Sequence, residues 1–105
     1  MTDTGTLTDR ARAWTIADRA RVCAGVTDLS AGPFGTTVTY LPGERLPGVA
    51  VTDDEVEISV VAELGRPLPE LAEQVRRAVT DLAGGRRINV RIHDVVQARQ
   101  EVGGS

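Results

Sequence analysis

Residues 56–96 read VEISVVAELGRPLPELAEQVRRAVTDLAGGRRINVRIHDVV, and this stretch decides the fold. Apolar and polar residues alternate over 56–64, which predicts a strand with one buried face. Apolar residues then recur at intervals of three and four from Leu68 to Leu82, which predicts an amphipathic helix. A second alternating run over 86–96 predicts a final strand. Because a strand, a helix and a strand follow in order, a right-handed crossover should set the two strands parallel.

The turn between the first strand and the helix, at 65–67, has two interpretations. A helix N-terminus can hold an anion, and Arg66 is the residue there that would seek one. However, Glu70 and Glu73 lie near the positive end of the helix dipole and already supply negative charge. The turn also lacks the glycines of a phosphate-binding loop. We therefore interpret it as a helix start, and leave open whether any ligand binds near Arg66.

Upstream of this stretch, the sequence predicts one more helix and two more strands. Apolar residues at helical spacing run from Ala13 to Cys23, so a helix should begin near Thr8 or Thr15 and end at residue 24. The glycine at 25 should close that helix. Residues 36–41 and 48–51 should form an antiparallel meander with the strand at 56–64. Pro-Gly pairs at both ends of 41–48 are typical of turns, so that segment is expected to be a loop.

The predicted fold class is therefore α+β. We expect one two-layer domain of order α-β-β-β-α-β, with a mixed sheet and both helices packed on one face. The domain should occupy residues 8–98, between flexible tails at 1–7 and 99–105. A chain of 105 residues can bury a core of its own without disulfides.

Composition narrows the classes of function. The 12 basic residues, all arginine, and the 15 acidic residues give a net charge of -3, which disfavours a broad electrostatic grip on nucleic acid. The first residues lack the basic and apolar segments of an export signal, and no apolar run is long enough to span a membrane. A single cysteine suits a reducing compartment. We therefore expect a cytoplasmic protein without direct membrane insertion.

The residue pattern predicts no catalytic, metal or cofactor site. His93 is the only histidine, so it would have to be the base of any triad, and it cannot form a zinc site with several imidazoles. Cys23 is interpreted as a small core residue rather than a nucleophile. Trp14 is interpreted as the edge of the core rather than a ligand platform. We expect a protein without enzymatic activity.

Three features remain as candidate interaction sites. The loop SAGPFG at 30–35 carries the only phenylalanine, and either tucks Phe34 onto the core or presents it as a flexible contact loop. The outer face of the predicted sheet mixes opposite charges with apolar side chains that could pair across a symmetric contact. A basic group follows the second helix. The outer-face residues are Glu57, Val61, Glu63, Arg91, His93 and Val95. The basic group consists of Arg76, Arg77, Arg86 and Arg87.

Three segments taken together resemble the bacterial alkaline-shock, or general-stress, envelope protein family. They are IADRARVCAGV at 16–26, VEISVVAELGRPLPELAEQVRRAV at 56–79 and INVRIHDV at 88–95. Their order and spacing carry the resemblance, and GPFGTTVTYLPGERLPGVAV at 32–51 looks like the short actinobacterial branch.

The resemblance implies a small non-enzymatic interaction or scaffold protein of the envelope stress response. It implies a cytoplasmic location, in some members near the membrane through an integral membrane anchor protein, and self-association as a homo-oligomer. It brings no catalytic residues. The alternative from another class is a small nucleic-acid-binding module, since small α/β domains often have that role. The acidic net charge and the absence of a GxxG loop disfavour it.

Overall fold

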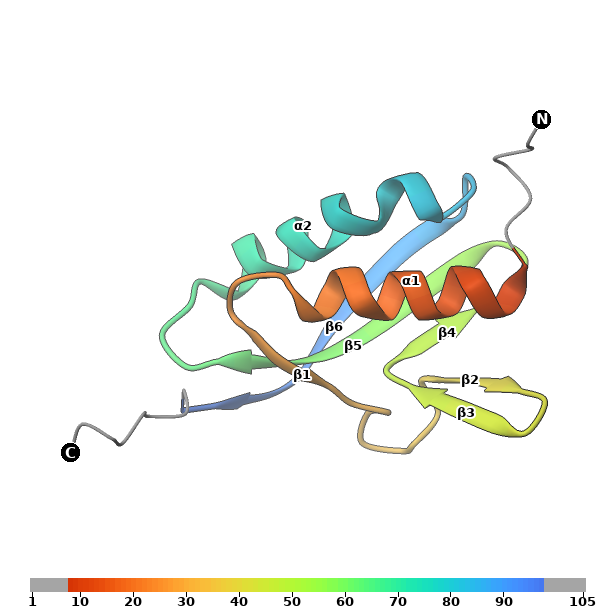
Figure 1. The fold of residues 1–105 in the computed structure, drawn as a ribbon. Helices are drawn as coiled ribbons and strands as arrows, with labels where there is room; N and C mark the ends of the chain where they lie inside the picture. Colours follow the sequence, from red (N-terminus) through yellow and green to blue (C-terminus); the bar gives the residue numbers. More distant parts are fainter. Residues whose placement is uncertain (1–7, 98–105) are drawn as a thin grey trace.

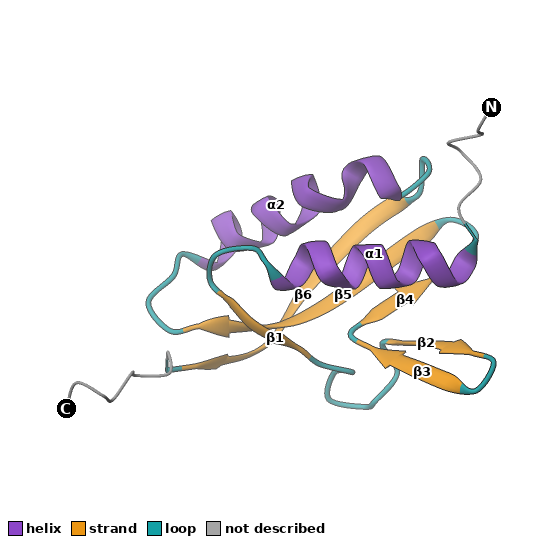
Figure 2. Cartoon of the chain, viewed as in Figure 1, coloured by secondary structure: helices purple, strands orange, loops and turns teal. Residues whose placement is uncertain are grey.

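The sheet is built around β5 (Glu55–Glu63) in the computed structural model, which describes residues 8–97. One edge of β5 pairs in parallel with β6 (Arg87–Val96), as the sequence predicts. The other edge pairs with two short antiparallel strands, β1 (Val26–Leu29) and β4 (Val49–Val51), which lie end to end along it (Figures 1 and 2). The sheet is therefore mixed. The predicted tails at 1–7 and 99–105 lie outside the described residues.

Both helices pack on one face of this sheet. α1 (Asp9–Arg21) begins after Thr8, whose side-chain oxygen accepts a hydrogen bond from the backbone N–H of Ala11 at 3.0 Å. α2 (Leu68–Val79) continues into a short 3₁₀ turn, η1 (Thr80–Leu82). The buried core contains side chains from both helices and from the inner face of β5. The principal ones are Ala13, Ile16, Ala17, Ala20, Val56, Ile58, Val60, Ala62, Leu71, Val75 and Val79. The predicted α+β class with helices on one face is confirmed.

The junction between β1 and β4 depends on Gly48. The backbone N–H of Ser59 in β5 donates to the carbonyl of Gly48 at 2.9 Å, and the carbonyl of Ser59 accepts from the N–H of Ser30 at 3.0 Å. One residue of β5 thus meets the end of one short strand and the start of the other. Gly48 has φ of +95°, and a Cβ there would lie 2.5 Å from the Cβ of Leu29. Only glycine fits this approach.

The predicted three-strand meander and the predicted loop at 41–48 are wrong in part. The pairing of β4 with β5 is confirmed, but β2 (Val38–Leu41) pairs instead with β3 (Glu44–Pro47) in a separate hairpin. Within residues 8–97, five strands therefore precede α2 rather than three. The segment 44–47 becomes a strand because Leu46 enters the core, while Pro47, which has no N–H to donate, stands at the strand's end.

Besides the burial of Leu46, two polar side-chain contacts tie the hairpin to the body. The hydroxyl of Thr39 donates to the carbonyl of Val49 at 2.6 Å. Nε of Arg10, in the first turn of α1, lies 2.6 Å from a carboxylate oxygen of Glu44. The hairpin therefore extends the domain beside β4 without joining the main sheet.

Candidate interaction surface

The outer face of β5 and β6, opposite the helices, carries most of the residues that the sequence placed there. Glu57 and Arg91 form an ion pair, with Nε of Arg91 2.8 Å from Oε2 of Glu57. The same carboxylate oxygen accepts a hydrogen bond from the hydroxyl of Thr37 at 3.3 Å. His93 is exposed, as predicted for an outward strand residue. The predicted mixture of opposite charges on this face is therefore confirmed for this pair.

A β-bulge overturns the prediction for Val95. Val60 of β5 faces Ile92 of β6, but the next residue, Val61, faces Asp94, so His93 is an extra residue in β6. An inserted residue shifts the inward and outward alternation by one position. Val95 consequently packs against the core rather than lying on the outer face. Leu64 is the last apolar residue of the alternating run at 56–64, but it is 62% exposed because it lies beyond the last residue of β5.

The segment between β1 and β2 folds over the outer face and forms a cleft. Its turn is fixed by hydrogen bonds from the N–H of Gly35 to the carbonyl of Gly32 at 3.1 Å and from the N–H of Thr37 to the carbonyl of Ala31 at 2.9 Å. The cleft has a volume of about 430 Å³, and the buried Ser59 lies on its lining. The remaining cleft residues that matter here are Phe34, Thr37, Glu57, Arg91 and His93.

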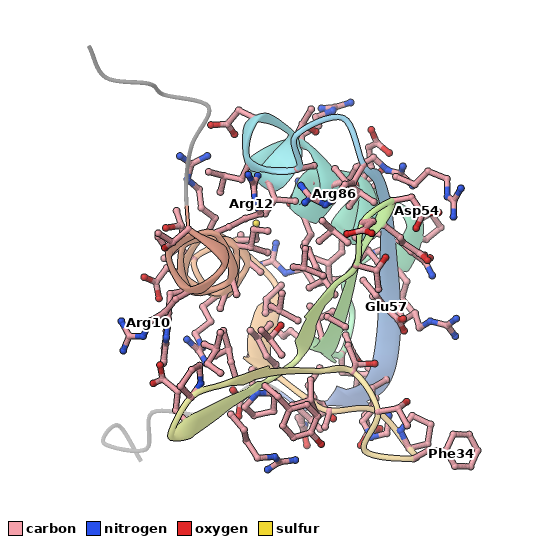
Figure 3. All side chains as sticks on the ribbon, turned by 90° about the vertical axis from the view of Figure 1, so that its right-hand side faces the viewer. Arg10, Arg12, Phe34, Asp54, Glu57 and Arg86 are labelled. Atoms are coloured by element: carbon pink, nitrogen blue, oxygen red, sulfur yellow. The ribbon has the colours of Figure 1, made fainter. Side chains whose placement is uncertain are left out.

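Phe34 does not pack on the core, so the first of its two sequence interpretations is wrong. Its side chain is 85% exposed, and Figure 3 shows the ring projecting from the loop into solvent, on the side of the chain where Glu57 lies. The turn 32–35 has glycines with positive φ at both ends. The chain reverses direction there, and Phe34 lies at the tip of the turn, away from the core. Neither the exposure of Phe34 nor its position beside the cleft could be derived from local pattern.

The other end of the outer face is more apolar. Val61 and Val96 line a shallow hollow together with Thr27, Asp28 and Gln97. Glu63, at the end of β5, is not among the residues that line this hollow. Its carboxylate forms an ion pair, with Oε1 3.1 Å from Nε of Arg66. The predicted interaction face is thus divided into a polar cleft and an apolar hollow.

The four arginines of the predicted basic group engage different acceptors. Arg76 and Arg77 both lie 3.5 Å from the carboxylate of Glu73. Nε of Arg86 donates to the carbonyl of Thr52 at 2.8 Å. Arg87 lies 4.0 Å from Glu55. Acidic or carbonyl oxygens therefore accompany each of these guanidinium groups.

The contacts of the turn before α2 favour its interpretation as a helix start rather than as an anion site. Arg66 pairs with Glu63, and its side chain lies against Gly25, where a Cβ would come 3.2 Å from the arginine's methylenes. The first turn of α2 contains Glu70 and has a proline in place of a side-chain cap. A phosphate would meet negative charge at this position.

Among the described residues, the side chains that could take part in catalysis or metal binding do not form a cluster. Cys23 packs against the core, and burial raises the pKa of its thiol. Trp14 packs at the edge of the core, as predicted. Asp54 accepts a hydrogen bond from the hydroxyl of Thr52 at 3.2 Å within the turn before β5. Within residues 8–97, no three His, Cys, Asp or Glu side chains gather closely enough to hold a metal ion.

Comparison of the chain with family models, curated proteins and solved structures finds no match. Among the described residues, none of the helices has the length and apolar character needed to cross a membrane.

Proposed function

We propose that this chain is a non-enzymatic interaction protein that binds a protein partner through the cleft on its outer sheet face and the loop above it. The observation that carries the proposal is the 85% exposure of Phe34 at the rim of that cleft. Burying such a ring in a partner would contribute about 1.5–3 kcal/mol, and aromatic side chains are common centres of binding energy.

The cleft supplies the polar part of such a contact. Arg91 and Glu57 present both signs of charge, and the hydroxyl of Thr37 is fixed by its bond to Glu57. A polar wall beside an exposed aromatic ring suits a peptide segment that offers one apolar side chain and backbone hydrogen-bonding groups.

The biological setting of the proposal comes from the resemblance to the envelope stress family. It makes the partner an integral membrane anchor protein, with this chain in the cytoplasm at the membrane surface. A nucleic-acid-binding module remains the alternative. The ion pairs around Arg76, Arg77 and Arg87 count against it, because a phosphate backbone would have to displace Glu73 and Glu55.

The test is in-cell crosslinking of a tagged copy at native expression, followed by membrane fractionation, nuclease treatment and mass spectrometry. The wild-type chain is compared with Phe34→Ala and with a matched control, Tyr40→Ala. Tyr40 is also an exposed aromatic residue, at 72%, but it lies on the β2–β3 hairpin away from the cleft.

We expect a membrane protein to be recovered after nuclease treatment with the wild-type and Tyr40→Ala chains and to be lost with Phe34→Ala. Equal recovery with both variants would show that the loop and cleft are not the contact surface. Recovery that depends on nucleic acid would favour the alternative and direct attention to the arginines at 76, 77, 86 and 87.

A further inference from the structure

β6 has an open edge. Among residues 8–97 it pairs only with β5, and Figure 2 shows no further strand of this part of the chain beyond it. α2 packs against β6, but a helix on the face of a sheet leaves the strand's edge free. The strand is ten residues long, whereas β1 has four residues and β4 is bordered by the hairpin. An open edge of this length presents a row of unpaired N–H and C=O groups.

The backbone groups that face this edge follow from the ladder with β5. The N–H of Arg87 donates to the carbonyl of Asp54 at 3.0 Å, and the carbonyl of Val96 accepts from the N–H of Leu64 at 2.7 Å. In a parallel pair, alternate residues of one strand bond to the same neighbour. With His93 as the extra residue, the backbone N–H and C=O groups that point away from β5, toward the open edge, belong to Ile88, Val90, Ile92 and Val95.

Val95 supports this assignment independently. Its N–H donates a hydrogen bond to Oδ1 of Asp94, the residue just before it, at 2.8 Å. An amide that bonded to β5 would not need this acceptor. The contact therefore satisfies an edge N–H within one copy, and a carbonyl from another strand could replace it.

We propose that the open edge of β6 binds the same edge of a second copy of this chain, antiparallel, around a two-fold axis between Ile92 and His93. Facing residues in such a contact must lie on the same face of the sheet. Because of the bulge, Arg91 and Asp94 both lie on the outer face, and Val90 and Val95 both lie on the inner face. This register pairs Ile88 with Gln97, Asn89 with Val96, Val90 with Val95 and Arg91 with Asp94 of the second copy. At the axis the two bulges meet, and there Ile92, on the inner face, lies opposite His93, on the outer face, so this central pair is the exception to the matching of faces.

The charges in this register are complementary. Arg91 faces Asp94 of the second copy, and the two-fold axis repeats the pair. Arg91 contacts Glu57 through Nε, which leaves its terminal nitrogens for a second carboxylate. Asp94 is exposed and can turn to Arg91 once another strand satisfies the N–H of Val95. Opposite charges that face one another across paired strands stabilise the pairing, and like charges oppose it.

This inference deepens the proposed function, because it names a second copy as one partner. It uses the backbone edge of β6, whereas the proposed partner contact is centred on the cleft and Phe34. Arg91 and His93 belong to both surfaces, but Phe34 belongs only to the cleft. Either of these two proposed contacts can therefore be refuted while the other stands. Loss of partner recovery in Phe34→Ala tests the cleft, and the mass of the purified chain in solution tests the edge.

Sedimentation equilibrium of the purified full chain, with two charge variants, tests the edge contact. We expect the wild-type chain to reach twice its 11.2 kDa mass as concentration rises. Arg91→Asp and Asp94→Arg each place like charges opposite one another, so each should raise the dissociation constant by at least about tenfold. An equimolar mixture of the two variants should recover the dimer, because each mixed pair again joins Asp with Arg.

Amide hydrogen exchange of the wild-type chain supplies a readout that needs no variant. The N–H of Val90 should become protected only at concentrations where the dimer forms. The N–H of Asn89, which faces β5, should be protected at every concentration. The proposal is overturned if the wild-type chain stays at the monomer mass up to about 1 mM, where even weak complexes form. It is equally overturned if the mixture of variants associates no better than either variant alone.

Discussion

The junction of the two short strands predicts a large cost for one added methyl group at Gly48. A non-glycine residue in the left-handed region costs about 1–2 kcal/mol. Replacing glycine by alanine returns about 0.4–1 kcal/mol through the unfolded chain. At Gly48 the new Cβ would also lie 2.5 Å from the Cβ of Leu29 and 3.2 Å from the backbone nitrogen of Ser30. Overpacking of this kind costs about 1–3 kcal/mol more, so Gly48→Ala should lower the free energy of unfolding by about 2–4 kcal/mol.

Gly65→Ala is the matched control for this prediction. Gly65 has φ of +97°, close to the +95° of Gly48, but no atom lies within 4 Å of the position that a Cβ would occupy there. Its substitution should therefore cost only about 1 kcal/mol from the backbone conformation. Urea denaturation followed by the fluorescence of Trp14, the single tryptophan, measures both variants. If Gly48→Ala is no more destabilising than Gly65→Ala, then the close approach of the strand ends does not constrain the fold.

Three further predictions concern the core, the outer face and the thiol. Ile58→Ala removes a fully buried side chain at the centre of β5 and should lower the free energy of unfolding by about 2–5 kcal/mol in the same assay; a smaller loss would mean that the core closes around the gap. Arg91→Ala removes an ion pair whose side chains are 63% and 28% exposed, so it should cost no more than about 1 kcal/mol; an undiminished cost in about 1 M salt would contradict a screened surface contact. Burial raises the pKa of the Cys23 thiol, so its alkylation should accelerate at higher pH than that of free cysteine. The pKa of this thiol is higher in the folded chain than in the unfolded chain. Its contribution to stability is therefore complete below the unfolded pKa and declines as pH rises through the folded pKa. Urea denaturation across alkaline pH should detect this decline in wild type and not in Cys23→Ala.

The two long strands and both helices could be predicted from the sequence because their signals are local. A strand that buries one face repeats every two residues, and a helix that buries one face repeats every three or four. β5, α2 and β6 carry these periods over nine or more residues each. The connection between the two strands then makes a parallel pair the expected arrangement.

The candidate surface could be predicted only in part. Glu57, Arg91 and His93 lie on the outer face because strand alternation holds up to the bulge. Val95 lies on the inner face because His93 is an extra residue, and no periodic pattern marks where a strand will gain one. Phe34 is exposed because the turn around it is set by backbone hydrogen bonds rather than by apolar burial.

The sequence by itself determined which segments are amphipathic, and therefore that two helices cover one face of a mixed sheet. Tertiary structure decided the rest. It set β1 and β4 end to end on one edge of β5, gave Leu46 a place in the core and so made a strand from an apparent loop, and left the edge of β6 open within residues 8–97. The physical reason is that periodicity reports how much of a segment is buried, whereas the neighbour that buries it is selected by packing between residues far apart in the chain.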